Sequence, residues 1–233
     1  LVNIAQPFKS SGMMLTCRKD MGVNSTDDLK GKTLGVWFYG NEYPFLSWMS
    51  RLGLATDGSA NGVTVLKQGW GVEPLTEGQA ACVSTMSYNE YWVVRDAGYT
   101  PEQLTVFKYQ AEGASTLEDG LYVLEKNLGD DSFKDKMVRF VRASMKGWKY
   151  AEANPKEAAS IILDNDDAGV QTEKHQIRMM GEIAKLTAGS NGSLDPSDYE
   201  RTVKVLMSGA SDPVITKEPS GAWTHDITNA ALN

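Results

Sequence analysis

Strand-like and helix-like segments alternate between residues 33 and 109, and no other feature of the sequence constrains the fold as much. Runs of β-branched and aromatic residues predict strands at 33–38, 63–67, 81–86 and 105–109. Between them, apolar residues at helical spacing predict helices that begin at Asn41 and Asn89 and end at Gly53 and Gly98. This alternation is typical of an α/β unit with parallel strands.

The segments on either side of this unit have a different character. Short apolar runs predict strands at 1–5, 13–17 and 121–124. Beyond residue 130 the pattern is almost wholly helical, with amphipathic stretches at 133–148, 154–163, 172–187 and 195–206 and a short helix near the end. Amphipathic helices must bury their apolar faces, and few strands are present to cover them. We therefore expect that further sequence precedes Leu1 in the complete protein.

Composition excludes several classes of protein. The 233 residues are 41% hydrophobic and 23% charged, which is ordinary for a globular protein. A formal net charge of −7 leaves no basic surface to neutralise phosphates, so we predict no nucleic-acid partner and no anionic membrane surface. No apolar run approaches the roughly 20 residues that span a bilayer.

The residues that usually carry chemistry are sparse. Cys17 and Cys82 are too few for a disulfide scaffold, and we interpret them as small buried core residues rather than a bridge. His175 and His225 have no histidine or cysteine partner at metal-ligand spacing. Phosphate-binding and dinucleotide-binding glycine motifs and a nucleophile elbow are absent. We predict no catalytic residue, metal or cofactor.

The first candidate binding segment is WFYGNEY, residues 37–43, where a predicted strand leads into a helix. Ligands of open α/β sheets bind at the carboxyl ends of strands. Strand alternation would place Trp37 and Tyr39 on one face, so one aromatic ring must find room outside the core. The alternative is a strand with core aromatics followed by a capped helix. The candidate residues are Trp37, Tyr39, Gly40, Asn41 and Glu42.

The second candidate segment repeats this arrangement around SYNEYW, residues 87–92. Its candidate residues are Ser84, Tyr88, Asn89 and Glu90, although Asn89 and Glu90 also suit a helix cap and a first turn. Two aromatic strand ends that both carry Asn-Glu should converge on one cleft. Aromatic walls with carboxylates suit a planar, hydrogen-bonding heterocycle. Because Glu42 and Glu90 would repel an anion, a neutral or cationic ligand is favoured over an anion.

The run DDLKGKTLG, residues 27–35, resembles the signature of type II periplasmic solute-binding proteins. More narrowly it is similar to the nitrate/sulfonate/taurine (SsuA/TauA-like) and NMT1/THI5-like branch. The run GNEYPFL at 40–46, the Tyr88-Asn89-Glu90 run and the pattern of Phe140, Gly147, Asn154 and Pro155 fit the same branch. The resemblance covers nearly the whole chain.

The resemblance implies two α/β lobes that are joined by two hinge strands and close on a small molecule. Residues 16–115 would form the second lobe, and residues 1–15 and 116–233 would belong to an incomplete first lobe. It also implies a periplasmic protein, or an extracytoplasmic lipoprotein, that delivers its ligand to the permease of an ABC importer.

Binders of pyrimidine precursors in this branch hold an aminopyrimidine between aromatic rings, and Glu90 matches the acid that recognises it. Ala81-Cys82 departs from the Asp-Ala that is usual in the family. Fungal relatives are enzymes with a cysteine-rich motif that this chain lacks, so we predict a transport receptor and not an enzyme. The alternatives are a THI5-like synthase and the effector-binding domain of a LysR-type regulator, which shares this fold.

Overall fold

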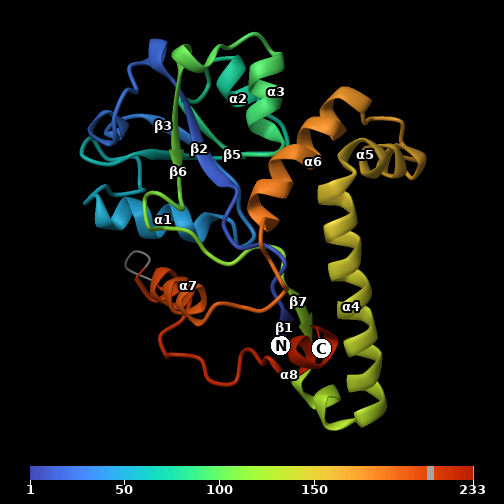
Figure 1. Cartoon of the computed structure of the whole chain (residues 1–233). Coiled ribbons are helices and arrows are strands. Elements are labelled where there is room, and N and C mark those ends of the chain that lie inside the picture. The colour runs from blue at the N-terminus through green and yellow to red at the C-terminus, as the bar shows by residue number, and fades with distance from the viewer. Residues whose placement is uncertain (209–212, 233) are drawn as a thin grey trace. The chain divides into compact units, whose positions relative to one another are not determined.

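The computed structural model describes residues 1–208 and 213–232, which divide into two compact units (Figure 1). The first unit comprises Leu1–Ser11, Leu117–Glu200 and Pro219–Asn233. The second comprises Gly12–Thr116 and Arg201–Glu218. Residues 201–218 thus group with the second unit, whereas the predicted division into lobes has boundaries only near residues 15 and 115.

A mixed five-stranded sheet forms the second unit, in the order β4-β3-β5-β2-β6. The strands are β2 (Met13–Arg18), β3 (Thr33–Val36), β4 (Thr64–Lys67), β5 (Cys82–Met86) and β6 (Leu104–Lys108). β3 runs parallel to β4 and β5, whereas β2 runs antiparallel to both β5 and β6. All four strands of the predicted alternation therefore run in one direction, and the preceding strand β2 is inserted among them.

Short helices connect these strands. They are α1 (Glu42–Arg51), α2 (Glu73–Thr76) and α3 (Glu90–Asp96), with single turns η1 (Lys19–Met21), η2 (Thr26–Leu29) and η3 (Pro101–Gln103). A capped turn forms at η2, where the side chain of Asp28 accepts hydrogen bonds from the backbone N–H groups of Asn24 and Ser25, both at 2.9 Å. Gly31 then ends the turn in the left-handed conformation (φ 74°).

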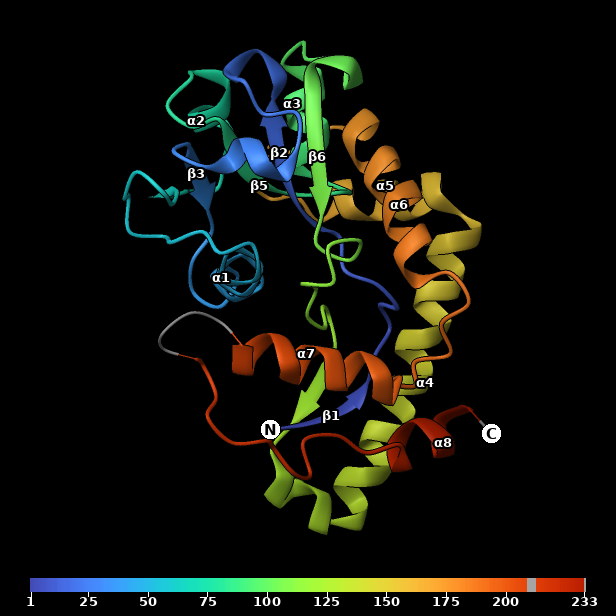
Figure 2. The ribbon, with the colours of Figure 1, turned by 90° about the vertical axis from the view of Figure 1, so that its left-hand side faces the viewer.

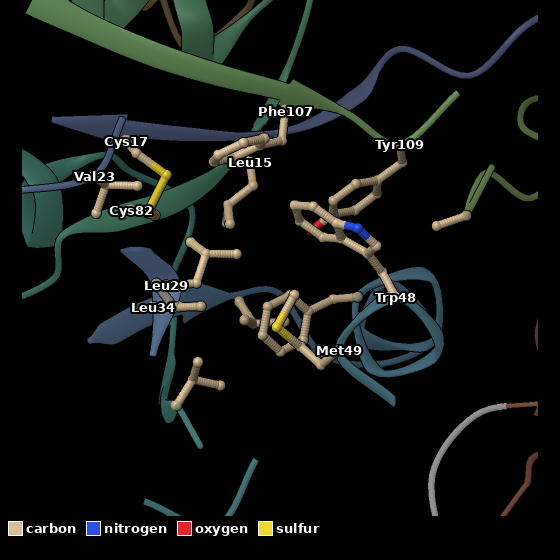
Figure 3. Close-up of a cluster of buried hydrophobic side chains, with 14 of the residues drawn as sticks. Leu15, Cys17, Val23, Leu29, Leu34, Trp48, Met49, Cys82, Phe107 and Tyr109 are labelled. Carbon is tan, nitrogen blue, oxygen red and sulfur yellow. A yellow bond between two sulfur atoms is a disulfide. The ribbon is translucent and has the colours of Figure 1, made fainter. Parts of the chain in front are cut away.

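The core of the second unit lies between α1 and one face of the sheet (Figure 3). Trp48 on α1 is 2% exposed, and its ring lies 5.4 Å from Phe107 and 5.7 Å from Tyr109. Leu15, Leu34 and other strand residues complete this cluster. The predicted helical spacing of α1 is thus explained by the burial of a single face.

Cys17 and Cys82 form a disulfide, so the expectation of two unbridged cysteines was wrong (Figure 3). β2 and β5 pair with Cys17 directly opposite Cys82. Directly opposed residues of antiparallel strands project to the same face at a separation that a disulfide can span. The sequence predicted both strands but gave no indication that they were neighbours, and their register is what brings the sulfur atoms together.

The first unit is mainly helical, as predicted. A two-stranded antiparallel sheet joins β1 (Val2–Ala5) to β7 (Leu121–Val123) (Figure 2). The helical elements are η4 (Glu125–Gly129), α4 (Asp131–Ala153), α5 (Pro155–Asp164), α6 (Glu173–Thr187) and α8 (Asp226–Leu232), and α7 (Pro196–Ser208) spans the boundary between the units.

α4 buries Val141 and Met145 against β1, β7 and α8. Phe140, which lies within the predicted amphipathic stretch 133–148, is 53% exposed. A residue one position before Val141 lies about 100° around the helix from it, at the edge of the buried face. None of the helices within the described ranges is long and apolar enough to cross a membrane.

Candidate functional site

A pocket of about 450 Å³ opens at the carboxyl ends of β3, β4 and β5, entirely within the second unit. This size is ordinary for a small-molecule site, typically about 300–1,000 Å³. The walls are supplied by the last residues of β4 and β5 and by residues that follow each strand: Trp37, Phe38, Tyr39, Asn41, Lys67, Gln68, Gly69, Trp70, Met86 and Glu90. The pocket therefore lies where open α/β sheets bind their ligands.

Four of the predicted site residues line this pocket: Trp37, Tyr39, Asn41 and Glu90. The two strand ends do converge, but not by the expected alternation along one strand. β3 ends at Val36, and the chain leaves the sheet before the aromatic run. The indole Nε1–H of Trp37 donates to the carbonyl of Gly69 at 2.9 Å, which ties the end of β3 to the end of β4.

The other predicted residues do not line the pocket: Gly40, Glu42, Ser84, Tyr88 and Asn89. The carboxylate of Glu42 instead accepts the backbone N–H of Gly40 at 2.7 Å. Ser84 is fully buried, and its Oγ donates to the carbonyl of Gly35 and accepts the N–H of Trp37. Ser84 therefore links β5 to the end of β3 without lining the pocket.

Asn41 and Asn89 precede α1 and α3 as predicted, but neither side chain caps its helix. The amide of Asn41 donates to the carbonyl of Phe38 at 3.4 Å. The amide of Asn89 donates to Glu90 Oε1 at 2.7 Å. Both side chains thus bind neighbouring pocket residues instead of the helix N–H groups.

Glu90 is the carboxylate of the pocket. The backbone N–H of Met86 donates to its Oε2 at 2.9 Å, while Asn89 holds Oε1. Burial raises the pKa of Glu90 above its ordinary value, and these hydrogen bonds oppose that effect only in part. Each oxygen retains a second lone pair, so Glu90 is a fixed acceptor for an N–H donor in the pocket.

Sequence reasoning missed the wall that follows β4: Lys67, Gln68, Gly69 and Trp70. The strand-end rule applied to β3 and β5 holds equally for β4, so the signal was present. Buried Gln68 accepts the N–H of Ser84 at 2.8 Å and donates to the carbonyl of Ser84 at 3.0 Å. These two bonds join the loop after β4 to β5. Trp70 is 97% exposed at the pocket rim.

Tyr39 holds a strained backbone conformation within this pocket. Its φ of 65° lies in the left-handed region, and its side chain is 91% exposed. For a residue with a Cβ, this conformation costs about 1–2 kcal/mol. The contacts that its ring makes are with the exposed side chain of Lys67, and strain of this kind is concentrated at functional sites. The phenol therefore occupies the pocket at a cost in stability.

We expect Tyr39→Gly to be more stable than Tyr39→Ala by about 1 kcal/mol, because both remove the ring and only glycine adopts this conformation without strain. Urea unfolding of the two variants measures the difference. At an unstrained position alanine would equal or exceed glycine, and that order would contradict the assigned conformation.

A family profile described as NMT1/THI5 like matches residues 1–158. Among solved structures, a protein of Bordetella bronchiseptica RB50 has a TM-score of 0.69 and 18% identity, covering 99% of this chain and 73% of that chain. The periplasmic sulfonate-binding protein SsuA of a sulfonate ABC transporter from Methylobacillus flagellatus KT has a TM-score of 0.66 and 13% identity, covering 99% and 68%. Likeness at these identities shows a shared fold. No curated protein sequence matches the chain.

Proposed function

This chain belongs to the NMT1/THI5-like family and has the predicted periplasmic-binding-protein fold, and on that basis we propose that it is the substrate-binding component of an ABC importer. The proposed ligand is a small, planar, nitrogen-containing ring. The second unit would be the second lobe and the first unit the remainder of the first lobe. As the resemblance implies, two lobes would close on the ligand, and the loaded protein would deliver it to a permease.

One observation carries this proposal: the pocket at the three strand ends has aromatic walls around one fixed carboxylate. Trp37, Tyr39 and Trp70 offer flat faces on which a ring can stack. Glu90 accepts a hydrogen bond from a ring or amino N–H, and Asn41 is placed to orient a polar edge. We assign direct contact to these lining residues, and a supporting role to Ser84 and Asn89, which hydrogen-bond to Trp37 and Glu90.

The disulfide supports an extracytoplasmic location. Disulfides persist in oxidising compartments such as the periplasm and are rare in the cytosol. It also bears on the enzyme alternative, because Cys17 and Cys82 are the only cysteines of the sequence and they bond to each other. Neither is placed to form the cysteine cluster of the fungal enzymes. We therefore propose a receptor rather than a synthase.

Calorimetric titration with an aminopyrimidine, taurine and nitrate tests the proposed ligand class. We expect the aminopyrimidine to bind with a Kd in the micromolar range or below, and taurine and nitrate to bind at least about tenfold more weakly. The physical reason is that only the ring uses both the aromatic walls and Glu90. Tight binding of taurine or nitrate that is unaffected by Glu90→Gln would overturn the assignment.

The pH dependence of ligand binding should follow the protonation of the Glu90 carboxylate. The ionised carboxylate is the acceptor, so affinity should fall as the pH falls through the pKa of Glu90. Because burial raises that pKa, the loss should begin at a higher pH than for an ordinary glutamate. We expect Glu90→Gln to weaken binding about tenfold or more near neutral pH and to abolish this component of the pH profile.

The matched control for that experiment is Glu73→Gln, since Glu73 is likewise the first residue of a helix, is exposed and lies outside the pocket. It should retain the affinity and the pH profile of the unmodified protein. Equal profiles for the Glu90 and Glu73 variants would exclude Glu90 as the titrating acceptor.

A further inference from the structure

The pocket wall contains a positively charged side chain that has no part in binding an uncharged ring. Lys67 ends β4, and among the described residues that line the pocket it is the only lysine or arginine. Glu90 is the only acid in the same set. The walls therefore carry one charge of each sign, whereas two carboxylates were predicted for the site.

Lys67 is held in place by aromatic side chains. Its Nζ donates to the hydroxyl of Tyr39 at 3.1 Å and lies 4.6 Å from the centre of the same ring. The ring of Phe38, which like Tyr39 follows β3, has its centre 5.5 Å from the same Nζ. Cation–π contacts of this kind restrict an otherwise flexible ammonium. The strained backbone of Tyr39 places the ring that makes the closest of these contacts.

The ammonium of Lys67 retains donor capacity. It has three N–H groups, and the hydroxyl of Tyr39 takes one of them. Within residues 1–208 and 213–232, no carboxylate forms an ion pair with Lys67. Among these described residues the ammonium thus has no carboxylate partner, and it lies beside the surface on which the ring would stack.

The expectation of a neutral or cationic ligand rested on Glu42 and Glu90 together. Glu42 does not line the pocket, because its carboxylate is turned to the N–H of Gly40. Only the carboxylate of Glu90 then remains as an argument against a negative group, and Lys67 supplies an argument in its favour.

We propose that the ligand is a planar heteroaromatic acid, whose ring stacks on Trp37 and Trp70 and whose oxyanion, a carboxylate or a phosphate, binds Nζ of Lys67. This inference rests on the proposed function and specifies its ligand. A small inorganic anion alone is a poor match, because it would leave the aromatic walls uncovered and find a single cation. Stacking of the ring on the aromatic walls supplies the contact area between ligand and protein. The bond between the oxyanion and Lys67 makes the site prefer acidic rings to neutral ones.

Matched pairs of probes test the oxyanion. Nicotinate against nicotinamide examines a carboxylate, and the phosphate ester of a hydroxymethyl aminopyrimidine against its parent alcohol examines a phosphate. We expect the acidic member of at least one pair to bind about 10–100-fold more tightly, which is the usual effect of a hydrogen bond to a charged group. The pair that shows the preference identifies which oxyanion the site takes. This preference should shrink as salt is added, because the ammonium is exposed.

Replacement of Lys67 tests whether the preference for the acidic probe depends on the charge of this side chain. Lys67→Met should abolish the preference of the site for the acidic probe over its neutral partner, and Lys67→Arg should restore part of that preference. Lys108→Met is the control, because Lys108 is the exposed last residue of the other edge strand, β6. It should behave as the unmodified protein.

The outcomes separate this inference from the proposed function. If neutral and acidic probes bind equally and Lys67→Met changes nothing, the oxyanion inference is wrong while the ring site stands. If no member of either pair binds, both the ring site and the inference are wrong. If the acidic probes are preferred equally before and after Lys67→Met, the anion is bound elsewhere and the assignment to Lys67 fails.

Discussion

Replacing Cys17 and Cys82 together with alanine should lower the free energy of unfolding of the second unit by about 4 kcal/mol. The disulfide joins residues 65 positions apart, and the chain-entropy model gives about 4 kcal/mol for a loop of that size, within the usual range of about 2–5 kcal/mol. Both side chains are fully buried, so lost packing adds to the effect. Urea unfolding followed by circular dichroism measures it.

A reductant provides the control for that measurement. It should destabilise the unmodified protein by a similar amount and leave the alanine double variant unchanged. Thiol titration of the purified, denatured but unreduced protein should find no free thiol. Two free thiols per chain, together with no response to reductant, would contradict both the disulfide and the support it gives to an extracytoplasmic location.

Trp48→Ala should lower the free energy of unfolding by about 3–5 kcal/mol, the usual cost of truncating a buried aromatic residue. Trp48 is 2% exposed and packs on Phe107 and Tyr109. Removal of its indole would leave a cavity between α1 and the sheet. Because the pocket lies at the strand ends, partial collapse of this core should also weaken ligand binding.

Trp70→Ala is the matched control, since it removes the same side chain from a position that is 97% exposed. We expect its stability to stay within about 0.5 kcal/mol of the unmodified protein, while the affinity for an aromatic ligand falls. Equal destabilisation by the two substitutions would contradict the assigned burial. Unchanged ligand affinity in Trp70→Ala would remove Trp70 from the site.

The helices and strands of the second unit were largely predictable because each has a local signal. Phe45, Trp48 and Met49 show the helical spacing of α1, and Gly53 ends it. What local patterns do not contain is the neighbour of each strand. The insertion of β2 between β5 and β6 pairs residues that are 65 to 94 positions apart, and the disulfide prediction failed for that reason.

The candidate site was predicted in part for a related reason. The rule that ligands bind at strand ends correctly brought Trp37 and Glu90 together. The prediction did not apply this rule to the end of β4, so it left out Lys67 and Trp70, and with Lys67 the positive charge of the pocket wall. The turn of Glu42 toward the N–H of Gly40 depends on side-chain geometry, which the Asn-Glu pattern does not specify.

The most direct test of the proposed ligand site is a crystal structure of the protein with a bound aminopyrimidine. The ring should lie at the carboxyl ends of β3, β4 and β5, stacked against Trp37 and Trp70, with its amino group donating to Glu90. A ring bound away from these residues, or a pocket that takes up taurine and excludes the aminopyrimidine under the same conditions, would contradict the proposed function.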